Sequence, residues 1–372
     1  MINQYLLSHS GEVTDGEKIW YVAQLCGLIM EINLFSKELR CIWKIPNSPH
    51  TCDYRSSLFY WDHKLYIFPY NQGGMYIYDL FTSKYEEIKV KKELELMGVV
   101  KRNQFLYAYG AKSTILKYNL EKGTVTYIDV QSKLYKLKNI PQICFWTKSF
   151  VADGNIYIPV SGTNAMIILD QNDEVSLLTL GKKMEKWILQ NIQMDNGRYC
   201  AIYGQGKIND ISTYVSEYDL NGKLIWKSSI KENYSYQFYP FLDVILIGDK
   251  WLFLPFGRNE VLIRDKTHEE ILFVIENGIE FSSDIIQGLF YCNVWVNDHT
   301  VYSINQAAGS LICIDIDNLA ISHSYLELKE DLGCIVEKVF QDAVRFRSII
   351  NESKEFYNIK SYIRFICNCK KM

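Results

Sequence analysis

The sequence lacks most of the signals by which membrane, secreted or nucleic-acid-binding proteins are recognised. No stretch approaches the ~18 consecutive apolar residues that a membrane-spanning helix requires, and the first residues have neither the basic start nor the apolar core of a signal peptide. Basic residues are not in excess, since 40 Lys and Arg stand against 43 Asp and Glu, for a net charge of −3. A duplex-binding surface usually shows as a basic excess, so we expect no nucleic-acid partner and no membrane contact.

Paired cysteines and metal-ligand spacings are also missing. The ten cysteines are scattered and include no C-x-x-C pair. Disulfide frameworks are typical of secreted proteins, and without a secretory signal we expect these side chains to be thiols in a reducing compartment. This predicts a cytoplasmic location. The six histidines show no ligand-pair spacing on one strand or helix, so we expect no metal and no cofactor.

Signatures of catalysis are absent as well. The chain has no G-x-S-x-G elbow, no complete P-loop and no S-x-D-x-G-x-T-W box. The segment Gly204-Gln-Gly-Lys207 matches only part of a P-loop, and we interpret it as a flexible loop. Carboxylates from different parts of the chain can still meet in space, as they do in glycosidases. Catalysis therefore stays open on the sequence alone.

What the sequence does have is aromatic side chains and a repeat. There are 27 Tyr, 18 Phe and 8 Trp beside only 7 Pro, a bias toward β-structure. A unit of apolar runs separated by polar loops recurs seven times, and one run of each unit ends in Asp or Asn. These residues, which are 40 to 51 positions apart, are Asn33, Asp79, Asn119, Asp170, Asp219, Asp265 and Asp315. Such a period is typical of propeller blades.

Each unit is interpreted as four short strands, for which residues 57–61, 65–68, 75–78 and 85–90 are the example. One unit cannot bury both faces of its sheet alone, whereas neighbours packed around an axis can. We therefore predict an all-β fold, a seven-bladed β-propeller of four-stranded antiparallel blades over residues 1–328. A pair of β-sandwiches or an irregular β-solenoid is the alternative. The repeated Asp and Asn side chains are expected to accept main-chain hydrogen bonds in Asx-turns.

Three groups of segments carry a resemblance to known blades. They are Leu65-Tyr-Ile-Phe-Pro with Tyr78-Asp-Leu, Ile156-Tyr-Ile-Pro with Leu169-Asp, and Tyr218-Asp-Leu-Asn-Gly-Lys-Leu-Ile-Trp. Through them the repeat resembles the kelch-like and quinoprotein-type β-propellers over residues 8–328. The resemblance implies a propeller that binds something. It implies no reaction, because propellers include both enzymes and scaffolds.

Residues 329–372 have a different pattern. Apolar side chains recur there at helical spacing, and Asn351 or Ser353 is placed to cap a second helix. We predict a C-terminal helical segment packed on or beside the propeller. Recognition of a partner by this segment, or formation of a homodimer through it, is the alternative. The oligomeric state does not follow from the sequence.

The candidate binding surface is the set of loops between the second and third strands of each unit, which share one face of a propeller with the connections between blades. Their amide and cationic side chains suit hydroxyl, carboxylate and peptide groups. The candidate ligand-binding residues are Asn71, Gln72, Asn164, Gln205, Lys207, Arg258, Asn259, Asn305 and Gln306. An insertion of about seven residues between Tyr203 and Thr213 is expected to form a loop over one side of the mouth. The alternative is that these polar residues serve only the loop backbones.

Two functions are compatible with these features. We interpret the chain as a non-catalytic binding module that holds a protein or glycan-like ligand on its loop-rich face. The alternative is an enzyme, a lyase or hydrolase acting on a carbohydrate or other small polar substrate at the central mouth. An enzyme should show clustered, desolvated acids or histidines with shifted pKa values, whereas a binding module should show a broad surface patch.

Overall fold

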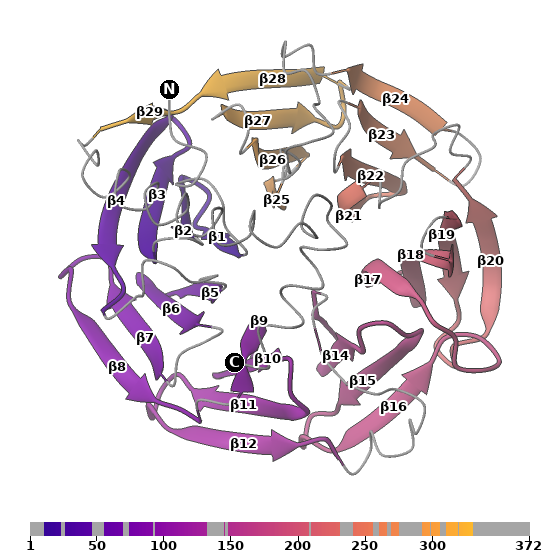
Figure 1. Ribbon diagram of the computed structural model, residues 1–372, viewed down its shortest axis with the longest axis horizontal. Helices are drawn as coiled ribbons and strands as arrows, with labels where there is room; N and C mark the ends of the chain where they lie inside the picture. The colour runs from indigo at the N-terminus through magenta and orange to yellow at the C-terminus, as the bar shows by residue number, and fades with distance from the viewer. Residues whose placement is uncertain are drawn as a thin grey trace, which may run out of the picture.

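The computed structural model describes residues 11–23, 27–46, 56–69, 74–91, 94–131, 145, 148–207, 210–230, 241–255, 260–265, 269–274, 292–297, 299–305, 310–318 and 320–329. The regular elements of these residues are β-strands, which form seven sheets around one axis (Figure 1). The prediction of an all-β, seven-bladed propeller of four-stranded antiparallel blades is confirmed. In the described part of the chain, no helix has the length and apolarity needed to cross a bilayer. Residues 330–372, predicted to be helical, lie outside the described residues.

The first strand of each blade lies nearest the axis and the fourth lies at the rim (Figure 1). Blades 1 to 4 consist of β1 (Glu12–Thr14), β2 (Lys18–Ala23), β3 (Leu28–Asn33) and β4 (Glu38–Lys44); β5 (Ser56–Trp61), β6 (Lys64–Pro69), β7 (Gly74–Asp79) and β8 (Tyr85–Lys89); β9 (Leu96–Arg102), β10 (Phe105–Gly110), β11 (Thr114–Asn119) and β12 (Val125–Asp129); and β13 (Phe150–Ala152), β14 (Asn155–Pro159), β15 (Ala165–Leu169) and β16 (Val175–Thr179). Blades 5 to 7 consist of β17 (Ile188–Asp195), β18 (Arg198–Lys207), β19 (Asp210–Tyr218) and β20 (Leu224–Ser229); β21 (Phe241–Ile247), β22 (Lys250–Pro255), β23 (Glu260–Arg264) and β24 (Glu269–Val274); and β25 (Cys292–Asn297), β26 (Thr300–Asn305), β27 (Ser310–Asp315) and β28 (Ala320–Tyr325).

The ring is fastened by one further strand. Every blade takes its four strands from one continuous stretch of chain, and β29 (Glu327–Leu328) then pairs in parallel with the outer strand β4 of blade 1. The amide of Lys329 donates to the carbonyl of Leu39 at 3.0 Å, and its ammonium group lies 2.5 Å from Glu38 Oε1. The end of the propeller is thereby tied to its beginning.

The repeated Asp and Asn residues form the predicted Asx-turns. Asp79 Oδ1, for example, accepts the amides of Phe81 and Thr82 at 3.0 and 2.8 Å. Asn33, Asn119 and Asp315 accept the amides at the same two positions, and Asp170 and Asp219 accept the amides two and four residues on. The seventh position, Asp265, is followed by residues outside the described set. At the six positions where the hydrogen bonds are described, the side chains therefore shape the turn after the third strand.

The core lies between neighbouring blades. Five of the six residues of β2 are buried, and so are five of the six in β6 and β10, because second strands are covered on both faces by the adjacent sheets. Tyr157 follows this rule, since it is 5% exposed and its ring packs edge-on against that of Tyr199 in blade 5, with the centroids 5.8 Å apart. The apolar columns of the sequence are thus the contact surfaces of the blades.

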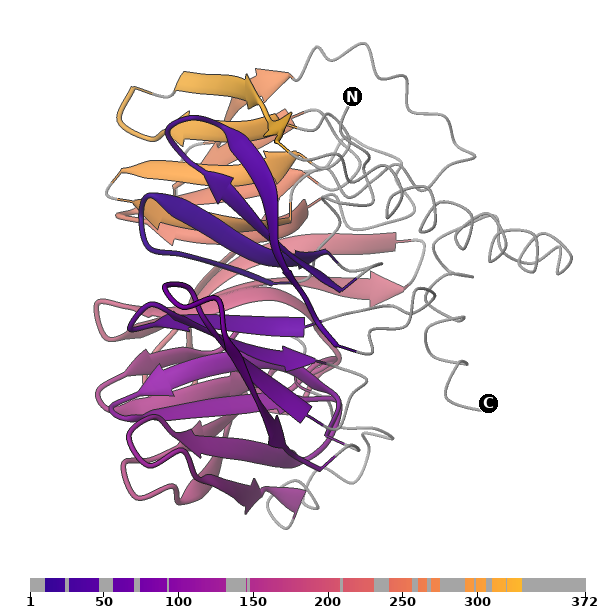
Figure 2. The same cartoon turned by 90° about the vertical axis from the view of Figure 1, so that its left-hand side faces the viewer.

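The strand directions give the ring two different faces. The turn face carries the turns that join first to second and third to fourth strands, and the loop face is formed by the opposite strand ends, with the described segments 160–164 and 180–187 (Figure 2). The insertion of blade 5 differs from our expectation of a flexible loop. Residues 204–207 belong to β18, which pairs with β19 out to Lys207 and Asp210. The extra residues lengthen a hairpin because alternate residue pairs of the added segments exchange cross-strand hydrogen bonds.

Candidate functional site

Only part of the predicted ligand-binding set can be placed. Asn71, Gln72, Arg258, Asn259 and Gln306 lie outside the described residues. Lys207 and Asn305 end the strands β18 and β26, and the description there covers the main chain alone. Asn164 and Gln205 are described in full, and both lie on the loop face of blades 4 and 5. The role of the set in ligand binding stays a prediction.

Asn164 uses its side chain inside the protein. It is 2% exposed, and its Nδ2 donates to the carbonyls of Leu180 and Lys183 at 2.5 and 2.9 Å. Its Oδ1 accepts the amide of Glu185 at 2.7 Å. These bonds fold the connection from β16 to β17 around the amide group. The Asn164 side chain therefore shapes the loop backbone, as the alternative interpretation of these polar residues expects.

Gln205 lies at the edge of the same connection. Its Nε2 donates to Glu185 Oε2 at 3.0 Å, and its Oε1 is 3.4 Å from the ammonium group of Lys227. The Lys227 ammonium also lies 3.7 Å from the ring centroid of Tyr214. The structure therefore brings Asn164 and Gln205 to one region through Glu185, a residue that the sequence did not single out.

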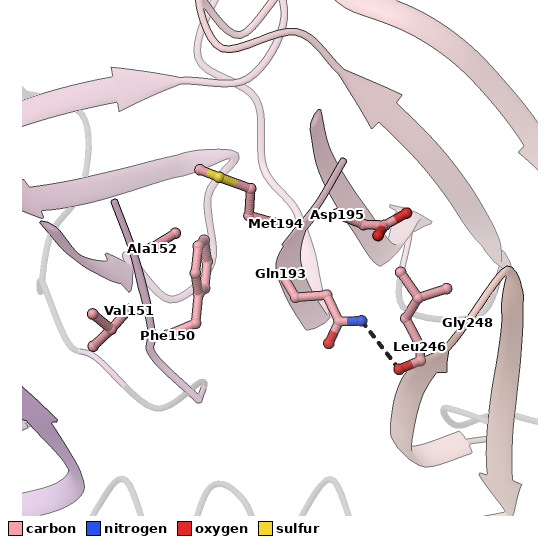
Figure 3. A pocket seen from close by; sticks show the side chains of 8 residues that line it. All are labelled: Phe150, Val151, Ala152, Gln193, Met194, Asp195, Leu246 and Gly248. Carbon is pink, nitrogen blue, oxygen red and sulfur yellow. Dashed lines mark hydrogen bonds between the residues drawn. The ribbon is translucent and has the colours of Figure 1, made fainter. Parts of the chain in front are cut away.

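A hollow opens between the inner strands of three neighbouring blades (Figure 3). Its volume is about 340 Å³, and it is lined by Phe150, Val151, Ala152, Gln193, Met194, Asp195, Leu246 and Gly248. These residues come from the inner strands of blades 4, 5 and 6 and from the turn after β21. Gln193 Nε2 donates to the carbonyl of Leu246 at 3.4 Å and ties the inner strands of blades 5 and 6 together (Figure 3).

A groove of about 380 Å³ adjoins the hollow and shares Asp195 and Leu246 with it. It runs between blades 5 and 6 on the turn face and is lined by Asp195, Asn196, Cys200, Glu217, Trp226, Leu246, Asp249, Trp251 and Asp265. We call it the blade 5–6 groove. Its volume lies within the range of roughly 300–1,000 Å³ that small-ligand pockets occupy.

Strand register places the walls of the groove. On blade 5, Cys200 is opposite Glu217 and Glu217 is opposite Trp226, so the three side chains share one face of the sheet. On blade 6, Leu246 is opposite Trp251. Trp251 is buried in an apolar cluster with Cys200, against which Trp226 packs. The groove thus has an apolar, indole-lined floor between two sheets.

The rim of the groove is acidic. Four carboxylates line it, and one of them, Glu217, is paired with Arg198 at 3.1 Å. Asp195 accepts a hydrogen bond from Asn196 Nδ2 at 3.2 Å. Asp249 is exposed in the turn after β21 and forms no ion pair with a described residue. A positively charged group in the groove would find carboxylates on both blades.

The described residues offer little for acid–base or metal chemistry. None of their His, Cys, Asp and Glu side chains come together in threes as a metal site would need. Burial raises the pKa of Tyr66 and Tyr107 to about 12, and it also raises the pKa of Tyr199 and Tyr218. These tyrosines belong to the packing between blades. The carboxyls whose pKa is lowered, those of Asp79 and Asp315, are held by turn amides.

The sequence reasoning missed the blade 5–6 groove because its residues are far apart in the chain. Asp195 ends the first strand of one unit, next to Asn196-Gly197, and Asp249 lies in the first turn of the next unit, beside Gly248. Such turns are expected to be polar for backbone reasons. A usable signal was that two adjacent units each combine an acidic residue at the first turn with a tryptophan in a strand, Trp226 in one and Trp251 in the other.

Similarity to known proteins is confined to the fold. No family model matches the chain, and no curated protein matches it. The solved structures that resemble it include a catalytically inactive form of virginiamycin B lyase from Staphylococcus aureus with quinupristin, at a TM-score of 0.59 and 11% identity over 82% of this chain and 94% of that one. The Pan2 WD40 domain of Neurospora crassa is similar at a TM-score of 0.56 and 13% identity over 82% and 88% of the two chains. An enzyme and a WD40 domain thus share the architecture, and the chain is a β-propeller.

Proposed function

We propose that the protein is a non-catalytic binding module that holds a partner protein by a lysine or arginine side chain in the blade 5–6 groove. The observation that carries this proposal is the groove itself, a cavity of about 380 Å³ with an indole floor and carboxylates on both walls. A cation above an aromatic face gains roughly 0.5–2 kcal/mol, more as water is excluded. Carboxylates add directional, charge-assisted hydrogen bonds.

The shape of the groove favours a side chain over a free metal ion or a substrate. It lies between two blades and is open to solvent, which leaves room for the chain that would carry the bound side chain. Trp226 is only partly buried and packs on the apolar cluster beneath, so an aliphatic stem can lie against it while the charged end reaches Asp249 or Asp195. Long basic side chains bury their stems in this way.

Three further features predicted from the sequence are also proposals. We propose a relationship to kelch-like or quinoprotein-type propellers, a cytoplasmic location, and a C-terminal helical segment over residues 329–372. The loop face remains a second proposed binding surface, and a glycan-like ligand there remains open to test. An enzymatic role as a lyase or hydrolase is the alternative function, and turnover of a carbohydrate substrate would be its signature.

The direct test is a titration of the protein with two short capped peptides, acetyl-Gly-Lys-Gly-Arg-Gly-amide and acetyl-Gly-Glu-Gly-Glu-Gly-amide. Proton–nitrogen correlation spectra report on the tryptophan indoles, and the variant Trp226→Phe assigns the signal of interest. We expect the basic peptide to shift the Trp226 indole signal with an affinity in about the millimolar range, and the acidic peptide to leave it unchanged.

A matched pair of variants locates the site. Asp249→Asn removes one negative charge from the groove, and Glu121→Gln removes one from an exposed turn of blade 3 on the same face. We expect the first to weaken peptide binding by about threefold and the second to have no effect. Equal weakening by both variants, absence of any shift, or a shift caused by an oligosaccharide but not by the basic peptide would each overturn the proposal.

A further inference from the structure

A short connection on the loop face concentrates positive charge. It runs from β16 to β17 with the sequence Gly181-Lys-Lys-Met-Glu-Lys-Trp187, and we call residues 181–187 the lysine loop. Lys182, Lys183 and Lys186 are exposed, and Met184 between them is 36% exposed. None of the three ammonium groups forms an ion pair or a hydrogen bond with a described residue.

The main chain of the lysine loop is held in one conformation. The buried amide of Asn164 binds Leu180, Lys183 and Glu185 together through three hydrogen bonds. At the start of the loop, the amide of Gly181 donates to the carbonyl of Gly222 in blade 5 at 2.6 Å. Hydrogen bonds at the start and in the middle of so short a segment leave its backbone little freedom.

The end of the loop is anchored by aromatic packing. The ring of Trp187 is stacked on that of Tyr203 with the centroids 3.5 Å apart and the planes at 1°. Glu185, the acidic residue of the loop, is engaged elsewhere, because its Oε2 accepts Trp187 Nε1 at 3.3 Å and Gln205 Nε2 at 3.0 Å. The carboxylate nearest to the lysines in sequence therefore forms no ion pair with them.

The positive surface continues onto blade 5. Lys227, on the outer strand β20, is exposed, and its ammonium group is 3.4 Å from Gln205 Oε1. It also lies over the half-buried ring of Tyr214. The described residues thus place four ammonium groups, an exposed thioether and an aromatic edge at the joint of blades 4 and 5.

We propose that the lysine loop, with Lys227, docks an acidic, extended segment of a partner protein. Fixed backbone geometry lowers the ordering cost of binding, and the uncompensated lysines supply complementary charge. Met184 offers an adaptable apolar contact between the charges. This surface is separate from the blade 5–6 groove, because Lys227 and Trp226 are successive residues of β20 and point to opposite sides of the blade 5 sheet. The groove also has the opposite charge.

Other polyanions fit the surface less well. A nucleic acid would neutralise many phosphates and needs a basic stripe longer than one loop, and the chain as a whole carries a net charge of −3. A phosphate-specific site would use the planar fork of arginine for paired oxygens, and the loop contains only lysines. An acidic peptide requires no more than spaced ammonium groups and an apolar contact.

The test uses the full chain and a fluorescein-labelled probe, the capped peptide Glu-Glu-Leu-Glu-Asp-Glu, with fluorescence anisotropy as the readout. The triple variant Lys182→Glu, Lys183→Glu, Lys186→Glu is compared with the triple variant Lys84→Glu, Lys89→Glu, Lys122→Glu. The second set changes the net charge equally at exposed lysines of blades 2 and 3. We expect about a tenfold or greater loss of affinity in the first and about a twofold change in the second.

Two further measurements separate this proposal from simple charge attraction and from the proposed function. Asn164→Ala keeps every lysine but removes the bonds that order the loop, so we expect severalfold weaker peptide binding in a protein whose circular dichroism shows it folded. Asp249→Asn should leave binding of the acidic probe unchanged, since it acts in the groove on the other side of the blade 5 sheet. A full loss with Asp249→Asn would contradict the assignment of two surfaces.

The proposal is supported if probe binding weakens with salt and is lost in the loop triple variant alone. It is overturned if the wild-type protein does not bind the probe, or if both triple variants lose affinity equally. It is also overturned if a duplex DNA or vesicles of phosphatidylcholine with phosphatidylserine bind more tightly than the peptide and lose affinity in the same triple variant.

Discussion

Two blade interfaces, 3–4 and 5–6, each bury an arginine at a strand end next to the turn face, but they surround it differently. Arg102 of blade 3 is 6% exposed and contacts Asp173 and the carbonyls of Leu169 and Asp170 in blade 4. Arg264 of blade 6 is 5% exposed and donates to the carbonyl of Ser229 and the hydroxyl of Ser228 in blade 5.

The difference shows how one architecture separates structure from binding. At the 3–4 interface a carboxylate is drawn inward, where Arg102, Lys117 and the Tyr107 hydroxyl all contact it. At the 5–6 interface the arginine binds a carbonyl and a hydroxyl, while the carboxylates of Asp195 and Asp249 line an open groove. A carboxylate that finds its hydrogen-bond and ion-pair partners within the protein stabilises the fold, whereas a carboxylate that lines an open groove can bind a ligand.

Among the substitutions that test this difference between the two interfaces, Asp173→Asn is expected to lower the free energy of unfolding most. The substitution leaves Arg102 in a buried site without its anionic partner, and stranding one member of a buried pair costs about 3 kcal/mol. Urea denaturation should therefore show a loss in the free energy of unfolding of that order. A change below ~1 kcal/mol would mean that the carbonyls of blade 4 satisfy the guanidinium without the carboxylate.

Tyr107→Phe is expected to have the next largest effect, a loss of about 1–2 kcal/mol in the free energy of unfolding. The substitution should also change how that free energy depends on pH. The Tyr107 hydroxyl accepts from Arg102 Nη2 and donates to Asp173 Oδ1, both at 2.8 Å. Burial, followed by the bond to Asp173, raises its pKa from 10.0 to about 12.

Because that pKa is higher in the folded state, the neutral phenol favours folding below pH 10, and this contribution is lost as the pH rises toward 12. The free energy of unfolding should fall more steeply over this window in the wild-type protein than in Tyr107→Phe. Denaturant titrations at matched pH values measure the two slopes. Parallel slopes would mean that Tyr107 does not titrate abnormally, and the interface would then be held by the ion pairs alone.

A smaller effect is expected from glycines in corresponding turns of the two regions. Gly154 has φ of +75° and Gly248 has φ of +59°, so alanine at either position incurs left-handed strain of about 1 kcal/mol. At Gly154 an added Cβ would also lie 2.7 Å from Gln171 Nε2, whereas nothing lies within 4 Å at Gly248. Thermal unfolding should show Gly154→Ala as the less stable variant, and the reverse order would contradict the open character of the hollow beside Gly248.

The sequence predicted the fold in detail because a repeat displays the same constraint seven times. Apolar columns such as the one containing Tyr107 and Tyr157 had to be buried between sheets, and the residues at Asp79 and its equivalents had to cap turns. The blade 5 insertion was misjudged as a loop, since Gly204 and Gly206 suggest flexibility and pairing across β18 and β19 was not visible in composition.

The candidate sites were predicted far less well, and the reason is geometric. The walls of the blade 5–6 groove come from two units, and only the assembled ring brings Asp249 near Trp226. Asn164 was recognised as a notable polar residue. Whether its side chain faces solvent or the protein depends on the path of the connection from β16 to β17, which folds around it. Residue type predicts which groups can bind a ligand, and packing decides whether they face water or the protein.

The smallest expected change in stability belongs to Asp249→Asn, and it completes the comparison with Asp173→Asn. Both substitutions replace one carboxylate by an isosteric amide, but Asp249 is exposed and has no ion-pair partner among the described residues. Its loss should alter the free energy of unfolding by less than ~0.5 kcal/mol. The two variants, measured in the same urea titration, should therefore differ by about 2–3 kcal/mol. If Asp249→Asn were as destabilising as Asp173→Asn, its carboxylate would be part of the framework of the blade 5–6 interface, and the groove would lose the unengaged charge on which cation binding depends.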